Sequence, residues 1–178
     1  MGDLGTILAA LWRAALLAAG FVLAFIVLLA PVSPGTGGWL MPDLIFCLAA
    51  VWVLRRPEGA PLPALLAIGL AADLLLGRPV GLGALSFLLA MEFLRTQATT
   101  LSGSGFLLEW LAITLVALGA AILLRLGLWI SLAEGPRTML LLHQALLTAL
   151  AYPLVAAFAR SVLRVRPAGR RYYGEAGS

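Results

Sequence analysis

The sequence contains no lysine, one cysteine and one histidine, and only 11% of its 178 residues are charged, against about a quarter in soluble domains. The single cysteine, Cys47, excludes an intramolecular disulfide. One cysteine with one histidine also cannot supply the ligands of a structural zinc site. We therefore expect neither a metal nor a cofactor.

Apolar residues take the place of the missing charge: 62% of the chain is hydrophobic and the mean hydropathy is +1.05. Such a composition predicts an integral membrane protein whose main partner is the lipid bilayer. A net charge of +4 would suggest nucleic acid in a soluble protein. Here the arginines stand mainly at the ends of apolar segments and in the C-terminal tail. Membrane topology accounts for them, so we expect no nucleic-acid partner.

Breaks rich in proline, glycine and arginine divide the chain into six apolar segments. We predict an all-α, polytopic membrane protein with about six transmembrane helices, at residues 11–30, 39–54, 62–77, 80–95, 106–130 and 138–160. One membrane domain (1–163) is followed by a basic cytoplasmic tail (164–178). The first segment is long for a signal peptide and lacks a clean cleavage pattern, so we interpret it as a retained span.

The second, third and fourth segments are short for membrane spans. Each has about 16 residues, or about 24 Å of helix, against a hydrocarbon core of about 30 Å. Neighbouring helices must shield these segments, or the bilayer must be thinner around them.

The arginines also predict the orientation. With both termini in the cytoplasm, nine of the twelve arginines lie inside, Arg78 and Arg137 face outward, and Arg125 falls within a span. The sequence therefore predicts a multi-pass protein with both termini cytoplasmic. The arginines of the tail are explained by topology alone, or by binding of anionic headgroups or a protein, and the sequence leaves this open.

Five polar residues are expected toward the outer ends of the spans. We call them the outer polar layer: Asp43, Asp73, Arg78, Arg125 and His143. Charges inside a membrane are costly unless they are neutralised. The layer is therefore either a self-satisfied network that fixes helix register, or a polar pocket or partner site open to the outside. For Asp43, which follows Pro42, a helix start is the simpler reading.

Other charged residues gather at the predicted cytoplasmic ends of the spans. We interpret this group as a solvated cytoplasmic rim: Arg55, Arg56, Glu58, Glu92, Arg95 and Glu109. Glu92 and Arg95 are three apart on one helix and can pair.

Small residues and one proline mark the last span. One of its faces predicts a packing seam made of Ala145, Ala149, Tyr152 and Ala156. Pro153 should bend this helix or leave a backbone carbonyl free.

Gly69, Asp73 and Gly77 recur at a spacing of four, so they share one helix face that another backbone can approach closely. The sequence Gly77-Arg78-Pro79 then suits a very short turn, because glycine favours a helix end and proline a helix start. We predict that residues 62–77 and 80–95 form an antiparallel hairpin.

These motifs resemble the rod shape-determining protein MreD family. The resemblance depends on Pro42-Asp43, on Arg56-Pro57, and above all on the stretch from 69 to 82, with Gly69, Asp73, Gly77, Pro79 and Gly81. It implies a bacterial inner-membrane component of the cell-elongation machinery, which builds peptidoglycan and maintains rod shape. The implied partners are MreC, the MreB cytoskeleton, and RodA with a class B penicillin-binding protein. It also implies kinship with the six-helix substrate-binding components of energy-coupling vitamin transporters. The lysine-free tail departs from the family and leaves cytoplasmic contacts unspecified.

Two functions follow. The chain is either a non-enzymatic scaffold for partner membrane proteins, or a small-molecule-binding subunit of a membrane transporter that uses the outer polar layer as its pocket. An intramembrane hydrolase is poorly supported, since no Gly-x-Ser-x-Gly elbow accompanies His143. A glycine-rich phosphate loop is also missing. We expect no enzymatic activity.

Overall fold

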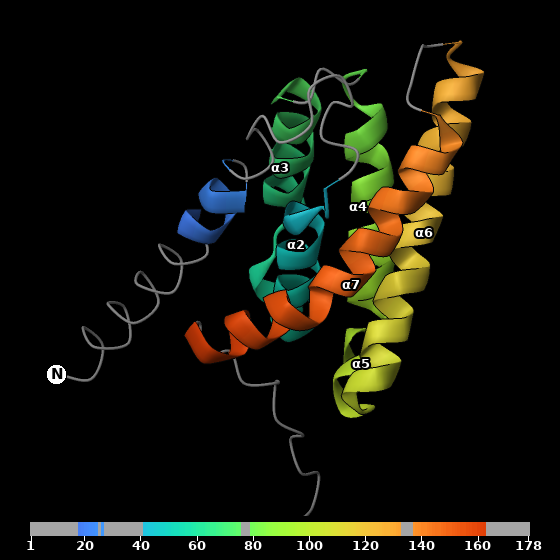
Figure 1. The fold of residues 1–178 in the computed structure, drawn as a ribbon. Coiled ribbons are helices and arrows are strands. Elements are labelled where there is room, and N and C mark those ends of the chain that lie inside the picture. The colour runs from blue at the N-terminus through green and yellow to red at the C-terminus, as the bar shows by residue number, and fades with distance from the viewer. Residues whose placement is uncertain (1–17, 25, 27–40, 76–78, 133–136, 163–178) are drawn as a thin grey trace, which may run out of the picture.

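The computed structural model describes residues 18–24, 26, 41–75, 79–132 and 137–162. Within these ranges all regular elements are helices, as predicted (Figure 1). Besides the helical residues 18–24, they are α2 (Leu44–Arg55), the short 3-10 helix η1 (Pro57–Gly59), α3 (Leu62–Leu75), α4 (Leu82–Thr96), α5 (Ala98–Gly103), α6 (Phe106–Ile130) and α7 (Thr138–Val162). Most of the first predicted span and the whole C-terminal tail lie outside the described residues.

Helix α2 begins where the sequence predicted a helix start. The Oδ1 atom of Asp43 accepts a hydrogen bond from the amide of Phe46 at 2.9 Å, so Asp43 is the N-cap. The helix ends at Arg55, and η1 follows at once with Pro57 at its first position. The result is a helix of only 12 residues.

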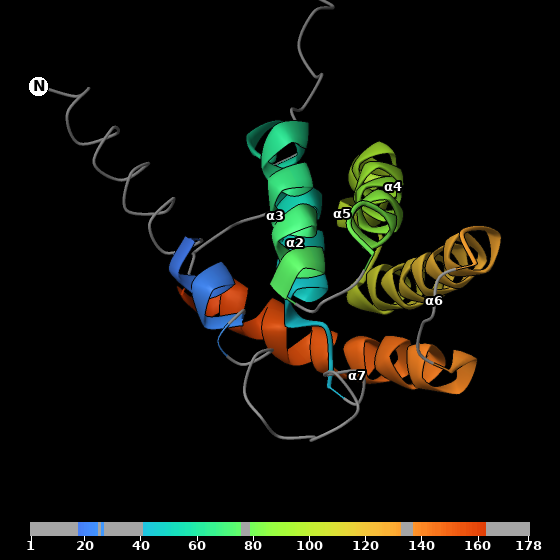
Figure 2. The ribbon, with the colours of Figure 1, turned by 90° about the horizontal axis from the view of Figure 1, so that it is seen from above.

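The interior position of α2 explains how so short a helix is accommodated. It packs against α4 and α7, and nine of its 12 residues are buried. Figure 2, seen from above, shows α7 running along one side of α2. Neighbouring helices therefore shield α2, which is one of the two outcomes predicted for so short a segment.

Helices α3 and α4 form the predicted antiparallel pair (Figure 1). The buried residues of α3 are Leu65, Gly69 and Asp73, which share one face. A Cβ added at Gly69 would lie 3.0 Å from the Cα of Ala84. Glycine is therefore what lets the two backbones approach here. Gly77 and Arg78, in the predicted turn, lie outside the described residues.

Helices α6 and α7 each have 25 residues, about 37 Å of helix. Among the described helices they are the two that are long and apolar enough to cross a membrane. The bounds 106–130 agree with the prediction. The short helix α5 lies in the predicted break between the fourth and fifth spans, and the sequence analysis did not predict this helix.

The predicted seam on α7 is confirmed, because Ala145, Ala149, Tyr152 and Ala156 are all buried. Figure 1 shows α7 changing direction along its length, and Pro153 is inside this helix. Pro153 has no N–H to donate to the carbonyl of Ala149 four residues earlier. The indole Nε1 of Trp110 on α6 donates to that carbonyl instead, at 2.8 Å. The proline therefore creates an acceptor that joins α7 to α6.

Candidate functional site

Asp73 caps a helix other than its own. Its side chain is 1% exposed, and its Oδ2 atom accepts from the amides of Gly81 at 3.0 Å and Ala84 at 2.9 Å. These amides belong to the first turn of α4, whose N-cap Gly81 has no side chain to cap it. A carboxylate is stabilised there by the free N–H groups and the helix dipole. We call this arrangement the interhelix cap.

Two glycines of α4 make the interhelix cap possible. Gly81 has a φ of 100°, a left-handed backbone conformation that residues other than glycine rarely adopt. A Cβ added at Gly83 would lie 1.9 Å from Oδ1 of Asp73, so the carboxylate occupies the space of the missing side chain. The motif in the sequence therefore encodes a contact between α3 and α4.

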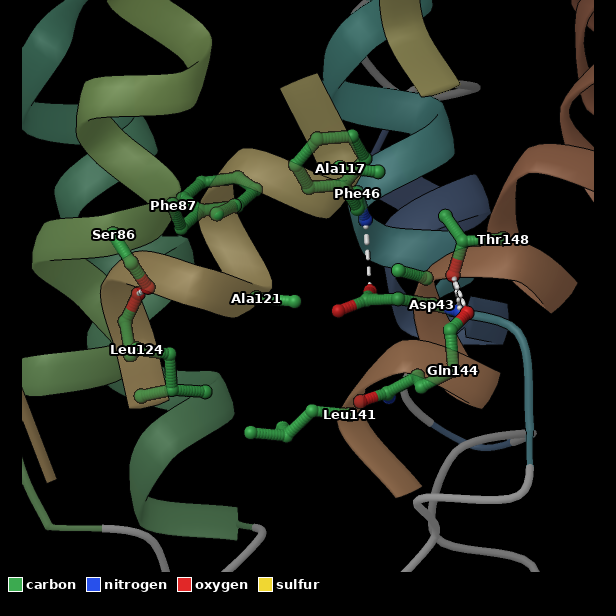
Figure 3. A pocket seen from close by; sticks show the side chains of 13 residues that line it. Asp43, Phe46, Ser86, Phe87, Ala117, Ala121, Leu124, Leu141, Gln144 and Thr148 are labelled. Carbon is green, nitrogen blue, oxygen red and sulfur yellow. Dashed lines mark hydrogen bonds between the residues drawn. The ribbon is translucent and has the colours of Figure 1, made fainter. Parts of the chain in front are cut away.

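A cavity of about 70 Å³ lies between α2, α4, α6 and α7 (Figure 3). Asp43, Gln144 and Thr148 supply most of its polar lining, and Phe46 and Phe87 are among the apolar residues. The amide of Asp43 donates to Oγ1 of Thr148 at 2.8 Å, which ties the start of α2 to α7. We call this space the Asp43 cavity.

Asp43 lies further along the bundle than the interhelix cap, although the cavity also reaches Gly83 of that cap. Thr148 is ten residues into α7, about 15 Å along the helix from Thr138. Figure 1 accordingly shows α2 beginning below the upper ends of α3 and α4. The two carboxylates expected in one layer therefore differ in depth and have separate roles.

Arg125 and His143, the other described residues of the outer polar layer, form no ion pair with the carboxylate of Asp43 or Asp73. His143 is exposed and its Nδ1 lies 3.0 Å from the carbonyl of Met139 on its own helix. Arg78 lies outside the described residues. These four described side chains therefore do not neutralise one another.

At the opposite end of the bundle, three polar side chains meet in the interior. We call them the Glu109 cluster. Nη2 of Arg55 donates to both carboxylate oxygens of Glu109 at 2.8 Å, and the hydroxyl of Tyr152 donates to Oε1 at 2.5 Å. The two charged side chains are only 7% and 5% exposed. The cluster joins α2, α6 and α7.

The interpretation of Arg55 and Glu109 as solvated rim residues was therefore wrong. Glu109 lies in the first turn of α6, but α2 is short and central, so its last residue meets α6 inside the bundle. The one available signal was a tyrosine on a seam of alanines, which indicates a buried hydroxyl in need of a partner.

The predicted pair of Glu92 and Arg95 is present on α4, with 3.6 Å between Nη1 and Oε2. Arg95 also donates from Nη2 to the carbonyl of Ala60, just before α3. These contacts hold the lower end of the α3 and α4 pair. No group of three or more potential metal ligands is found among the described residues.

These features define a class. The described chain is entirely helical, two of its helices are long and apolar enough to cross a bilayer, and its buried charges are paired or capped, as in a membrane protein. The chain belongs to the rod shape-determining protein MreD family, whose model matches residues 9–162. The match confirms the resemblance seen in the motifs and extends it over nearly the whole chain. No curated protein and no solved structure matches it.

Proposed function

We propose that this protein is a non-enzymatic inner-membrane scaffold of the machinery that elongates the bacterial cell wall. The observation that carries the proposal is the family match over residues 9–162, which supports a role in rod shape. The polar groups favour this role over catalysis, since the Glu109 cluster and the interhelix cap are occupied by contacts within the protein. MreC, the MreB cytoskeleton, and RodA with its penicillin-binding protein are the proposed partners.

An apolar groove over α4, α5 and α6 fits a transmembrane helix of such a partner. Its lining includes Leu89, Phe93 and Leu115 along the sides. Ala112 and Gly119, seven residues apart on α6, give it a low floor, and a Cβ at Gly119 would meet nothing within 4 Å. Small residues at a helix surface let a second helix approach closely in lipid.

Filling this groove should abolish function without unfolding the protein. We expect Gly119→Leu to accumulate in the membrane at wild-type level but to fail to restore rod shape in cells depleted of their own family member. Ala157→Leu, a similar enlargement at an exposed position of α7, should restore rods. Cell shape and membrane abundance are measured together, with co-purification of the proposed partners in mild detergent. Round cells with Ala157→Leu, or rods and intact complexes with Gly119→Leu, would refute the groove assignment.

One observation, the Asp43 cavity, supports the transporter alternative. A vitamin-sized ligand retained through purification, together with failure of the wild-type protein to restore rod shape, would favour a transport subunit over the scaffold. Recovery of wall-synthesis proteins would favour the scaffold.

We also propose six spans with both termini in the cytoplasm. The antiparallel pairs α3 with α4 and α6 with α7 support this arrangement, since they place Arg55, Arg95 and Glu109 at one end of the bundle. A reporter that is active only in the periplasm should be silent when fused after Ser178, whereas one that is active only in the cytoplasm should give signal. The opposite pattern would exclude the proposed orientation.

A further inference from the structure

The carboxylate of Asp43 is only partly used by the fold. Its Oδ1 atom accepts from the amide of Phe46, and no described residue donates to Oδ2. Figure 3 shows the carboxylate projecting from the start of α2 into the open space, toward Ala121 on α6. One oxygen is therefore available to a group that enters the Asp43 cavity.

A second polar side chain in the same cavity has an unused group. Gln144 on α7 is 7% exposed and lines the cavity, and its Nε2 atom has no hydrogen-bond partner within the described part of the chain. A buried amide without a partner costs free energy, and in native proteins it usually faces water or a ligand. Among the described residues, two polar atoms of the cavity thus have no hydrogen-bond partner: an acceptor on Asp43 and a donor on Gln144.

The lining of the cavity indicates the charge that a ligand would carry. The described residues that line it include Asp43 with its carboxylate but no arginine or histidine. The rings of Phe46 and Phe87 also line it, and aromatic faces attract cations. Ser86 donates its hydroxyl hydrogen to a backbone carbonyl of its own helix, so its oxygen is left as an acceptor. The carboxylate would repel an anion, whereas Oδ2 of Asp43 and the hydroxyl oxygen of Ser86 can accept from the N–H donors of a cation. Nε2 of Gln144 is itself a donor and requires an oxygen atom of the same ligand.

The size of the cavity admits a small group. Its volume of about 70 Å³ is more than the roughly 10 to 15 Å³ that one water molecule needs. It can hold a small cationic group, with the rest of the molecule directed out of the cavity.

We propose that the Asp43 cavity binds a primary ammonium group, with the Asp43 carboxylate as its counter-ion and Nε2 of Gln144 as a donor to an oxygen atom of the same ligand. A free small amine and the headgroup of an ethanolamine lipid share this chemistry. The inference concerns a binding site and does not depend on the scaffold role proposed above.

The test uses the full-length protein reconstituted in nanodiscs. In phosphatidylcholine discs, saturable binding of free ethanolamine is measured by calorimetry, with ethylene glycol as an uncharged ligand of similar size. In discs that also contain phosphatidylethanolamine, retained lipid is counted by native mass spectrometry. Binding of free ethanolamine indicates a soluble amine, and selective retention of the lipid indicates a headgroup. Failure of both, equal binding of ethylene glycol, or displacement of the amine by equimolar sodium would overturn the proposal.

Variants assign the binding to the cavity. Asp43→Asn keeps an oxygen for the helix cap but removes the charge, and we expect at least a tenfold loss of amine binding. Ala121→Leu fills the cavity but leaves the hydrogen bond between Asp43 and the amide of Phe46 in place, and it should cause a similar loss of amine binding. It therefore tests the proposal even if Asp43→Asn fails to fold. Glu58→Gln removes a carboxylate from an exposed position and should bind like wild type. Unchanged binding in Ala121→Leu would place the amine elsewhere.

Discussion

Replacing Glu109 by alanine is expected to lower the free energy of unfolding by about 3 to 5 kcal/mol, the range found when one partner of a buried ion pair is removed. The change would leave the guanidinium of Arg55 buried without a counter-ion and the hydroxyl of Tyr152 without an acceptor. Reversible unfolding in detergent micelles measures the loss, and membrane abundance should fall with it.

Two controls separate burial of charge from removal of a side chain. Glu58→Ala, at an exposed site, should change stability by less than about 0.5 kcal/mol. The double variant Arg55→Met with Glu109→Leu removes both charges and should recover most of the stability, because apolar residues can replace a buried ion pair. If the double variant were less stable than Glu109→Ala, the ion pair would stabilise the fold by more than the cancellation of two buried charges.

The second large effect is expected at Gly83. Its replacement by alanine should destabilise the protein by about 3 kcal/mol or more, because the new methyl group would overlap the Asp73 carboxylate. Displacing that carboxylate also removes the acceptor for the amides of Gly81 and Ala84. The measurement is again unfolding in micelles.

A double-mutant cycle checks the mechanism. Asp73→Ala alone loses the interhelix cap but makes room, so adding Gly83→Ala to it should cost little more. Gly119→Ala, on the surface of α6 with nothing within 4 Å, should be neutral or slightly stabilising. Additive losses in the cycle would mean that Gly83 is constrained by something other than Asp73.

The sequence predicted those features that depend on local spacing. The start of α2 follows from Asp43 next to Pro42, whereas the face of α3 that carries Gly69 and the alanine seam of α7 follow from positions three or four residues apart. Each is a property of one helix, so a single sequence is enough to read it.

The features that the sequence did not predict depend on where one helix ends relative to another. Asp73 accepts hydrogen bonds from amides at the start of α4, and no count of charged residues includes such groups. Glu109 was assigned to a solvated rim because it lies near the predicted cytoplasmic end of its helix. Its burial results from the length of α2, which brings Arg55 to the same depth.

The interhelix cap has a consequence for how the chain assembles. A helix whose first turn is completed by a residue from the preceding helix is not independently stable at that end. In the six-span topology proposed above, helices α3 and α4 should therefore enter the bilayer as one cooperative hairpin, and a nascent chain stopped between them would hold a carboxylate in hydrocarbon with no amides to receive it. Because the acid is synthesised before the amides, that topology makes the hairpin the smallest unit in which the carboxylate is capped.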